Sequence, residues 1–382
     1  MMMDKKKFFF DDLESLRGFA CILVFLQHML WICPLRFLHN IVPRSLSNCT
    51  GGVGVFFAIS GFVVTLSLLN KFRSSSGESF LERLQSKRST VFSFYKTRFF
   101  RIFPVLMLVV LGTVLFLELT ENDAGFCAFI FRVPAEILFG VYNYSVGAYV
   151  SVEKIHPCGL GPFWTLAVEA QFYLLWPMAL LLFKSNNARA LMSLGLGCMF
   201  MFVIQPLCLY FFNLDYYNHC NNLSELFLGA FFAFIYEEGI GKDANKTICM
   251  VAGIFLAMMI WSYNGTISER GAFFSRIVPS LSSVLLVALC AFVRGSFRIP
   301  LLDGLLQYLG SRSYSLYAVQ LLIANIVVYY TNSIYFPKES LSEYDFYLYQ
   351  LIIVIVLVLV VAELSYRFME KPMRRFVSKS KE

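Results

Sequence analysis

Charged residues are scarce in this chain of 382 residues. Asp, Glu, Lys and Arg make up 15% of it, whereas soluble domains carry about 25%. Hydrophobic residues make up 58%, in apolar runs that recur along the whole chain. This composition excludes a soluble globular protein and predicts an all-α, polytopic membrane protein. The net charge of +7 does not indicate nucleic-acid binding, because the basic residues are concentrated in particular loops.

Several motifs that carry chemistry in other proteins are also missing. The ten cysteines form no CxxC pair and no Cys/His metal spacing, so we expect no metal ion. The chain has no Gly-rich phosphate loop and no GxSxG elbow. The N-terminal lysines and the apolar segment after them lack the cleavage site of a secretory signal. Four cysteines lie on or near the predicted outer side, where disulfides can form: Cys49, Cys127, Cys158 and Cys220.

Ten segments are apolar and close to the roughly 20 residues needed to cross a bilayer. They cover residues 16–33, 52–70, 102–119, 168–184, 190–212, 222–238, 246–263, 275–294, 312–333 and 346–365. With both termini in the cytoplasm, only seven of the 32 Lys and Arg residues fall in outer loops, as the positive-inside rule requires. We expect one membrane domain with its core over 13–374 and no appended periplasmic domain.

The outer segment 126–144 is ambiguous. It is apolar but is interrupted by Arg132, Pro134 and Glu136. We interpret it as a re-entrant or interfacial helix, because counting it as a span would invert every later loop and place the basic C-terminus outside.

The first apolar segment, Leu13–Trp31, contains an arginine near its entrance and a histidine inside it. Arg17 and His28 are eleven residues apart, which on a helix is three turns plus roughly 20°, so both side chains lie on one face about 16 Å apart. An ionisable residue inside a span is functional by default, and the alternative is a packing histidine bonded to a neighbouring helix. Neutral histidine suits the role of a general base near pH 7.

The second span opens with GGVGVFFAISGF, Gly51–Phe62. Gly54, Ala58 and Gly61 follow helical spacing, which predicts that another helix packs closely against them. Ser60 is a candidate for lining a polar pocket instead.

The third span begins after a long cytoplasmic loop, 71–100, that ends in FYKTRFFRIFP. Arg98 and Arg101 are three residues apart and share a face at the mouth of this span. One interpretation is that these arginines only follow the positive-inside rule, which places basic residues at the cytoplasmic ends of spans. The functional alternative is a phosphate clamp, because the planar guanidinium group donates paired hydrogen bonds to phosphate oxygens.

The fourth span begins within FWTLAVEAQFYLLWP, Phe163–Pro177. Glu169 and Gln171 enter it among aromatic residues, and a carboxylate there indicates binding or catalysis. The aromatic residues Trp164 and Tyr173 are candidates for substrate contacts, and an aromatic belt at the membrane interface is the alternative.

These blocks, taken in order, resemble the signature blocks of the acyltransferase-3 family of bacterial membrane O-acyltransferases. The resemblance comprises Leu16-Arg17-Gly18 with His28, then GVGVFFAISGF, then Tyr95 to Pro104, then FWTLAVEAQFYLLWP, then SYSLY at Ser313–Tyr317 and the region Glu363–Pro372. It covers nearly the whole chain, from about Leu13 to Arg374. One departure is Gln320, where many members carry a histidine. Because an amide does not titrate, we assign Gln320 no catalytic role from the sequence.

The resemblance implies roles for individual residues. His28 and Arg17 would form the essential pair, with His28 as general base or, alternatively, as an acyl-histidine nucleophile. Arg98, Arg101 and Tyr95 would bind the donor, acetyl-CoA. From the residues themselves, we expect Glu169, the third catalytic candidate, together with Gln171, to position or hydrogen-bond the acceptor from the outer side. The candidates for binding substrate or shaping the entrance are Glu14, Ser60, Trp164, Gln171 and Tyr173.

The expected function is through-membrane transfer in the bacterial inner membrane. Acyl-CoA would stay at the basic cytoplasmic face, and a cell-surface glycan or lipid-linked sugar, such as lipopolysaccharide O-antigen, would enter from the periplasm. Acetyl is expected because it is the commonest acyl group in the family. The alternatives are a transporter of acyl groups or glycan intermediates, although the ionisable residues cluster in the first four spans, and a structural partner in a glycan-assembly complex.

Overall fold

The computed structural model describes residues 11–32, 51–72, 79–120, 126–145, 159–207, 223–239, 246–262, 269–293, 295–297, 301–332 and 343–379. Within these ranges the chain is helical and contains no β-strand. The elements are α1 (Asp11–Ile32), α3 (Gly51–Phe72), α4 (Phe80–Leu119), α5 (Phe126–Leu138), η2 (Gly161–Phe163), α7 (Trp164–Leu182), α8 (Asn186–Met199), η3 (Phe200–Ile204), α10 (Leu223–Glu237), α11 (Lys246–Ser262), α12 (Glu269–Phe292), α13 (Asp303–Ser311), α14 (Ser313–Tyr330), α15 (Glu343–Ser365), η6 (Tyr366–Glu370) and α16 (Lys371–Lys379).

Each of the ten predicted spans falls on a helix, and the protein is a multi-pass membrane protein. Among the described residues, six helical stretches are long and apolar enough to cross a membrane. They are Gly51–Phe72, Phe80–Leu119, Gly161–Leu182, Asn186–Leu207, Ser313–Tyr330 and Asp345–Phe376. Two shorter apolar stretches, Thr247–Met259 and Ile277–Phe292, match two more of the predicted spans. Ten crossings and cytoplasmic termini remain predictions.

The predicted loop 71–100 is wrong from Phe80 onward, because α4 is a continuous helix of 40 residues. Ser79 is its N-cap and forms a capping box with Glu82: the Ser79 hydroxyl accepts from the Glu82 amide, and the Glu82 carboxylate accepts from the Ser79 amide. The box satisfies two backbone donors that a helix start leaves unpaired. The helix therefore carries Arg98 and Arg101 within its length, where their positions are fixed.

The segment 126–144 is only partly helical. Helix α5 ends at Leu138 after 13 residues, which is about 20 Å of helix and too short to span the hydrocarbon core. Gly140 follows with a φ of +71°, a backbone conformation that favours glycine. Arg132 and Glu136 form an ion pair on this helix. The four cysteines offered for disulfides, and His39, His156 and His219, lie outside the described side chains.

Close helix crossings at paired glycines hold the bundle together. A Cβ added to Gly61 would lie 1.9 Å from the Leu226 carbonyl oxygen, and one added to Gly229 would lie 2.2 Å from the Ala58 oxygen. Helices α3 and α10 therefore touch through their backbones, as the spacing of Ala58 and Gly61 predicted. Small residues permit this approach where helices pack within a membrane.

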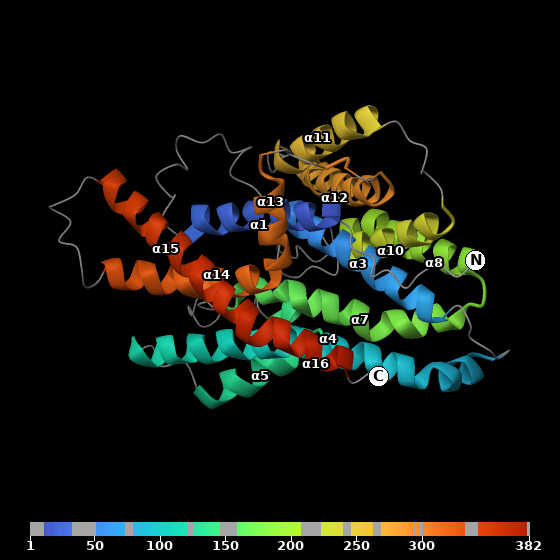
Figure 1. The fold of residues 1–382 in the computed structure, drawn as a ribbon, viewed down its shortest axis with the longest axis horizontal. Coiled ribbons are helices and arrows are strands. Elements are labelled where there is room, and N and C mark those ends of the chain that lie inside the picture. Colours follow the sequence, from blue (N-terminus) through green and yellow to red (C-terminus); the bar gives the residue numbers. More distant parts are fainter. Residues whose placement is uncertain are drawn as a thin grey trace.

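A second crossing joins α1 to α13, which stands across it (Figure 1). A Cβ added to Gly310 would lie 1.9 Å from the Glu14 carbonyl oxygen, and one added to Gly18 would lie 2.0 Å from the Leu306 oxygen. Ser15 also donates a 2.7 Å hydrogen bond to Asp303. Helix α13 lies outside the ten predicted spans, and its contacts fix the turn of α1 that carries Arg17.

We expect Gly61→Ala to destabilise the protein strongly, because its methyl group would overlap a backbone oxygen that only a shift of α10 can move. Overpacking of this kind costs about 1–3 kcal/mol or more. The matched control is Gly195→Ala in α8, where an added Cβ meets nothing within 4 Å. Thermal unfolding of the purified variants in detergent checks this. An equal midpoint for Gly61→Ala and Gly195→Ala would contradict the described crossing.

Candidate functional site

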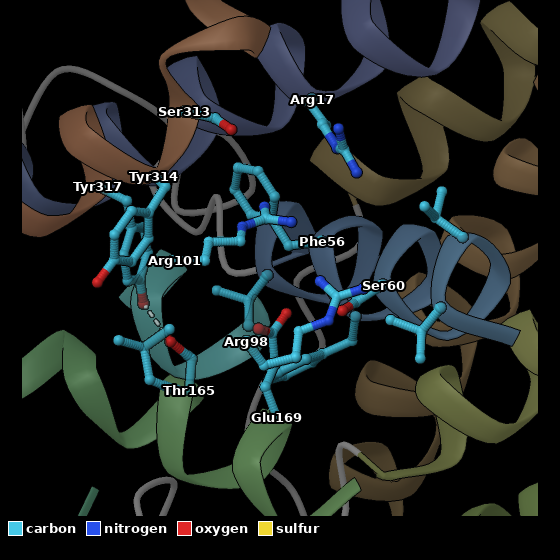
Figure 2. Close-up of a pocket in the computed structure, with 15 residues that line it drawn as sticks. Arg17, Phe56, Ser60, Arg98, Arg101, Thr165, Glu169, Ser313, Tyr314 and Tyr317 are labelled. Carbon is cyan, nitrogen blue, oxygen red and sulfur yellow. Dashed lines mark hydrogen bonds between the residues drawn. The ribbon is translucent and has the colours of Figure 1, made fainter. Parts of the chain in front are cut away.

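A cavity of about 90 Å³ lies where α1, α3, α4, α7 and α14 meet. Figure 2 shows three guanidinium groups directed into it, those of Arg17 from α1 and of Arg98 and Arg101 from α4. The remaining polar lining includes Ser60 of α3 and Glu169 of α7. Three cations and one carboxylate give the cavity a positive balance, so it suits an anionic or strongly dipolar ligand.

Arg17 lies at the α1 side of the cavity and forms a 3.2 Å ion pair with Glu14, one turn earlier on the same helix. Both side chains are largely buried, with exposed fractions of 22% and 14%. Glu14 thus orients Arg17 at the cavity edge.

Arg98 is held by aromatic rings. Its guanidinium carbon lies 4.9 Å from the centroid of the Tyr173 ring and 5.3 Å from that of Phe94, in the range of cation–π attraction. Its Nε atom is buried and has no hydrogen-bond partner among the described residues. A buried N–H without a partner is costly, so this guanidinium group is prepared to bind an anion.

Arg101, one turn further along α4, lies within electrostatic range of the carboxylates of Glu169 and Glu370. Glu370 accepts a 2.9 Å hydrogen bond from Ser315 and pairs with Arg374. The cationic cluster at this end of the cavity is therefore backed by acidic residues, which limit repulsion among the arginines while the bundle folds.

A chain of hydroxyl groups joins α3 to α7 beside these arginines. The hydroxyls of Ser60 and Tyr173 lie 2.6 Å apart, and Tyr173 donates a 2.8 Å bond to Glu169. The Tyr173 hydroxyl group is thus part of this hydrogen-bonded row, while the Tyr173 ring packs against the Arg98 guanidinium group. The sequence placed these three residues in one site, and the fold does bring them together.

His28 lies deeper along α1 and does not line the cavity itself. Its ring centroid is 6.4 Å from that of Tyr317, which does line the cavity. The His28 Nδ1 atom is buried and has no hydrogen-bond partner in the described part of the chain. A ring nitrogen in this condition is available to accept a proton or a hydrogen bond from a bound hydroxyl.

Helix α14 supplies part of the lining that the sequence did not predict. Tyr317 donates a 2.9 Å hydrogen bond to the Pro162 carbonyl and lies 3.0 Å from the Thr165 hydroxyl, while Tyr314 donates to the Ile102 carbonyl. Ser313 lines the cavity one turn before Tyr317 (Figure 2). The signal was in SYSLY: tyrosines within a span need partners for their hydroxyls, so they mark a polar interior.

Three of the sequence candidates lie elsewhere. Tyr95 donates a 2.8 Å bond to the Leu174 carbonyl and ties α4 to α7. Gln171 donates to the Gly140 carbonyl at 2.6 Å and to Asn143, so it holds the turn after α5. Trp164 is buried against Phe57, with ring centroids 6.3 Å apart. None of the three lines the cavity.

Comparison with known proteins gives a family match over nearly the whole chain. The family described as "Acyltransferase domain", acyltransferase-3, matches residues 10–365. The chain belongs to the acyltransferase-3 family. Its matched region includes α1 with Arg17 and His28 and every helix that lines the cavity.

Curated relatives include O-acetyltransferase OatA of Staphylococcus aureus (strain NCTC 8325 / PS 47), 26% identical over 96% of this chain and 57% of the relative. Peptidoglycan O-acetyltransferase OatA of Listeria monocytogenes serovar 1/2a is 23% identical over 85% of this chain and 51% of the relative. The chain thus spans little more than half the length of these relatives. No solved structure matches it.

Proposed function

We propose that this acyltransferase-3 protein transfers an acetyl group from acyl-CoA to a hydroxyl group of a cell-surface glycan. The observation that carries the proposal is the cavity itself: three arginines converge on it, and the Arg98 Nε atom has no partner among the described residues. Guanidinium groups bind phosphate strongly and directionally. A donor that carries several phosphates matches this charge.

The arginines would bind the donor from the predicted cytoplasmic side. Arg98 and Arg101 lie on α4 within the run that the positive-inside rule places near the cytoplasm. Arg17 and its partner Glu14 lie in the first turns of α1, at the same end of the bundle as Arg98. Phosphates held there would direct the acyl thioester inward, along the face of α1 that leads to His28.

His28 would serve as the general base. It would accept the proton of the acceptor hydroxyl as the hydroxyl oxygen attacks the thioester carbonyl, and it would return that proton to the leaving thiolate. Glu169 is hydrogen-bonded to Tyr173, which contacts both Ser60 and Arg98. Through these contacts Glu169 would position Arg98 and the acceptor relative to each other. Holding both reactants in this way is itself a large part of the rate enhancement.

The acceptor class is proposed by comparison alone. The Listeria relative is named for peptidoglycan, so a cell-wall glycan is the first acceptor to test, ahead of lipopolysaccharide O-antigen and lipid-linked sugars. A periplasmic entry for the glycan agrees with the proposed topology.

The test is release of the free CoA thiol by purified protein in nanodiscs, with acetyl-CoA and with peptidoglycan or polysaccharide acceptors offered separately. We expect thiol release that depends on an acceptor, together with acceptor molecules heavier by one acetyl group in mass spectra. A carrier consumes no thioester. Absence of thiol release with every glycan, in folded protein, would refute the proposal and favour the transporter alternative.

A further inference from the structure

Helix α14 presents a polar stripe to α1. Ser313, Tyr317 and Gln320 are spaced four and three residues apart, so they lie on one face of the helix. The first two line the cavity, and Tyr317 lies beside the His28 ring. Helices α1 and α14 pack against each other and run side by side in Figure 1. Gln320 continues this stripe by one turn beyond Tyr317.

The Gln320 amide is buried without a hydrogen-bond partner. The residue is 1% exposed, and no described residue accepts a hydrogen bond from its Nε2 atom. The buried amide of Gln350 is satisfied, because its Nε2 atom donates to Thr331 at 2.7 Å and to Asn332 at 3.1 Å. The Asn143 Nδ2 atom is also without a partner among the described residues, but it lies at the turn after α5 and not beside His28. An unpaired buried amide lowers stability, which indicates that Gln320 is placed for a ligand and not for the fold.

Two unpaired atoms thus lie on the facing stripes of α1 and α14. The His28 Nδ1 atom is the available acceptor, and the Gln320 Nε2 atom is the available donor. Tyr317, one turn before Gln320 on α14, lies beside the His28 ring, with ring centroids 6.4 Å apart. Acyl transfer needs both a hydrogen-bond acceptor and a donor. The attacking hydroxyl oxygen loses a proton to the acceptor, and the carbonyl oxygen gains negative charge that the donor stabilises.

We propose that Gln320 is a catalytic residue whose Nε2 atom donates a hydrogen bond to the carbonyl oxygen of the acyl thioester. This inference rests on the proposed acetyl transfer. The hydroxyl oxygen of the acceptor forms a bond to the carbonyl carbon, its proton passes to the His28 Nδ1 atom, and the carbonyl oxygen becomes an oxyanion that Gln320 stabilises. The C–S bond then breaks, and the proton passes from His28 to the sulfur.

A neutral amide performs this role without titrating. An oxyanion needs a fixed N–H donor and no change of protonation state. A histidine placed at position 320 offers its Nε2 atom at the same number of bonds from Cα, so it is a conservative replacement for the donor.

The experiment compares Gln320→Met, Gln320→His and Gln320→Asn with wild-type protein in the thiol-release assay, with elution profile and thermal midpoint recorded for each. Methionine keeps the size and removes the donor, so we expect kcat to fall about 10²- to 10³-fold, with the KM for acetyl-CoA changed less than threefold. We expect Gln320→His to retain most of the wild-type kcat, and Gln320→Asn, whose donor is one carbon shorter, to lie between.

Gln350→Met is the matched control, because it removes a buried amide that already has partners. We expect it to lower the thermal midpoint and leave kcat unchanged. A Gln320→Met kcat within threefold of wild type would overturn the inference, as would equal losses in Gln320→Met and Gln320→His. If wild-type protein releases no thiol, the proposed function fails instead, so the two failures are distinguishable. If Gln320→Met does not fold, the inference is tested by the other two variants: a kcat higher in Gln320→His than in Gln320→Asn supports it, and the reverse order overturns it.

Discussion

His28→Gln is expected to abolish acetyl transfer while the protein remains folded and inserted. Glutamine is close to histidine in size but cannot accept the hydroxyl proton, and general base catalysis contributes about 10²- to 10⁴-fold to rates. The His28 Nδ1 atom has no partner among the described residues, so the substitution removes no hydrogen bond of this atom. We therefore expect kcat for thiol release to fall by at least about 10²-fold, with little change in thermal midpoint.

His219→Ala provides the matched histidine control, because the sequence places His219 in an outer loop. It should retain wild-type activity. Rapid acid quench followed by mass spectrometry of the His28 peptide separates the proposed general-base mechanism from the acyl-histidine alternative, since only the covalent route accumulates an acetylated histidine. Retained turnover in His28→Gln would refute both mechanisms.

Apolar runs of membrane-spanning length made the helices predictable, and the helical repeat predicted the face shared by Arg17 and His28. A helix repeats every 3.6 residues, so spacing alone shows which side chains share a side. Within the described ranges a helix covers most of each of the ten apolar segments. Ser60, Arg98, Arg101 and Glu169 also converge on the cavity, because a polar group inside a span is stabilised only where it faces other polar groups.

Partners distant in sequence could not be predicted in this way. Gln171 and Tyr95 look like site residues in the chain, yet each satisfies a backbone carbonyl, at Gly140 and Leu174 respectively. Which carbonyl is free depends on where helices break, as at Gly140. The part of the cavity wall that α14 supplies was missed for the same reason, since Tyr317 finds Pro162 across 155 residues of sequence.

The length of α4 was missed for a different reason. Its first turns, Phe80 to Phe100, are rich in Ser, Lys and Arg, and hydropathy alone interprets such a segment as a loop. The capping box at Ser79 and Glu82 was the local signal that a helix begins there. This difference matters for function, because a helix fixes Arg98 and Arg101 relative to each other and to Glu169, whereas a loop would leave them free.

The second large effect is expected for the arginines of α4. Arg98→Gln with Arg101→Gln should raise the KM for acetyl-CoA by about two orders of magnitude or more, since hydrogen bonds to charged groups contribute about 1.5–3 kcal/mol each and 1.4 kcal/mol is a factor of ten. Saturation with acetyl-CoA in the thiol-release assay measures this. The kcat extrapolated to saturating donor should change much less, because these residues hold phosphates away from the reacting carbonyl.

Arg132→Gln is the matched control. Arg132 is 61% exposed on α5, pairs with Glu136, and does not line the cavity. Arg98→Lys adds a finer test, since lysine keeps the charge but loses the planar pair of donors that Arg98 directs into the cavity. If phosphate is held by two parallel bonds, Arg98→Lys will resemble Arg98→Gln, and if charge alone matters, it will resemble wild type. A double variant with normal donor KM and a raised KM for the glycan would instead assign the cavity to the acceptor, and the donor would have to enter elsewhere.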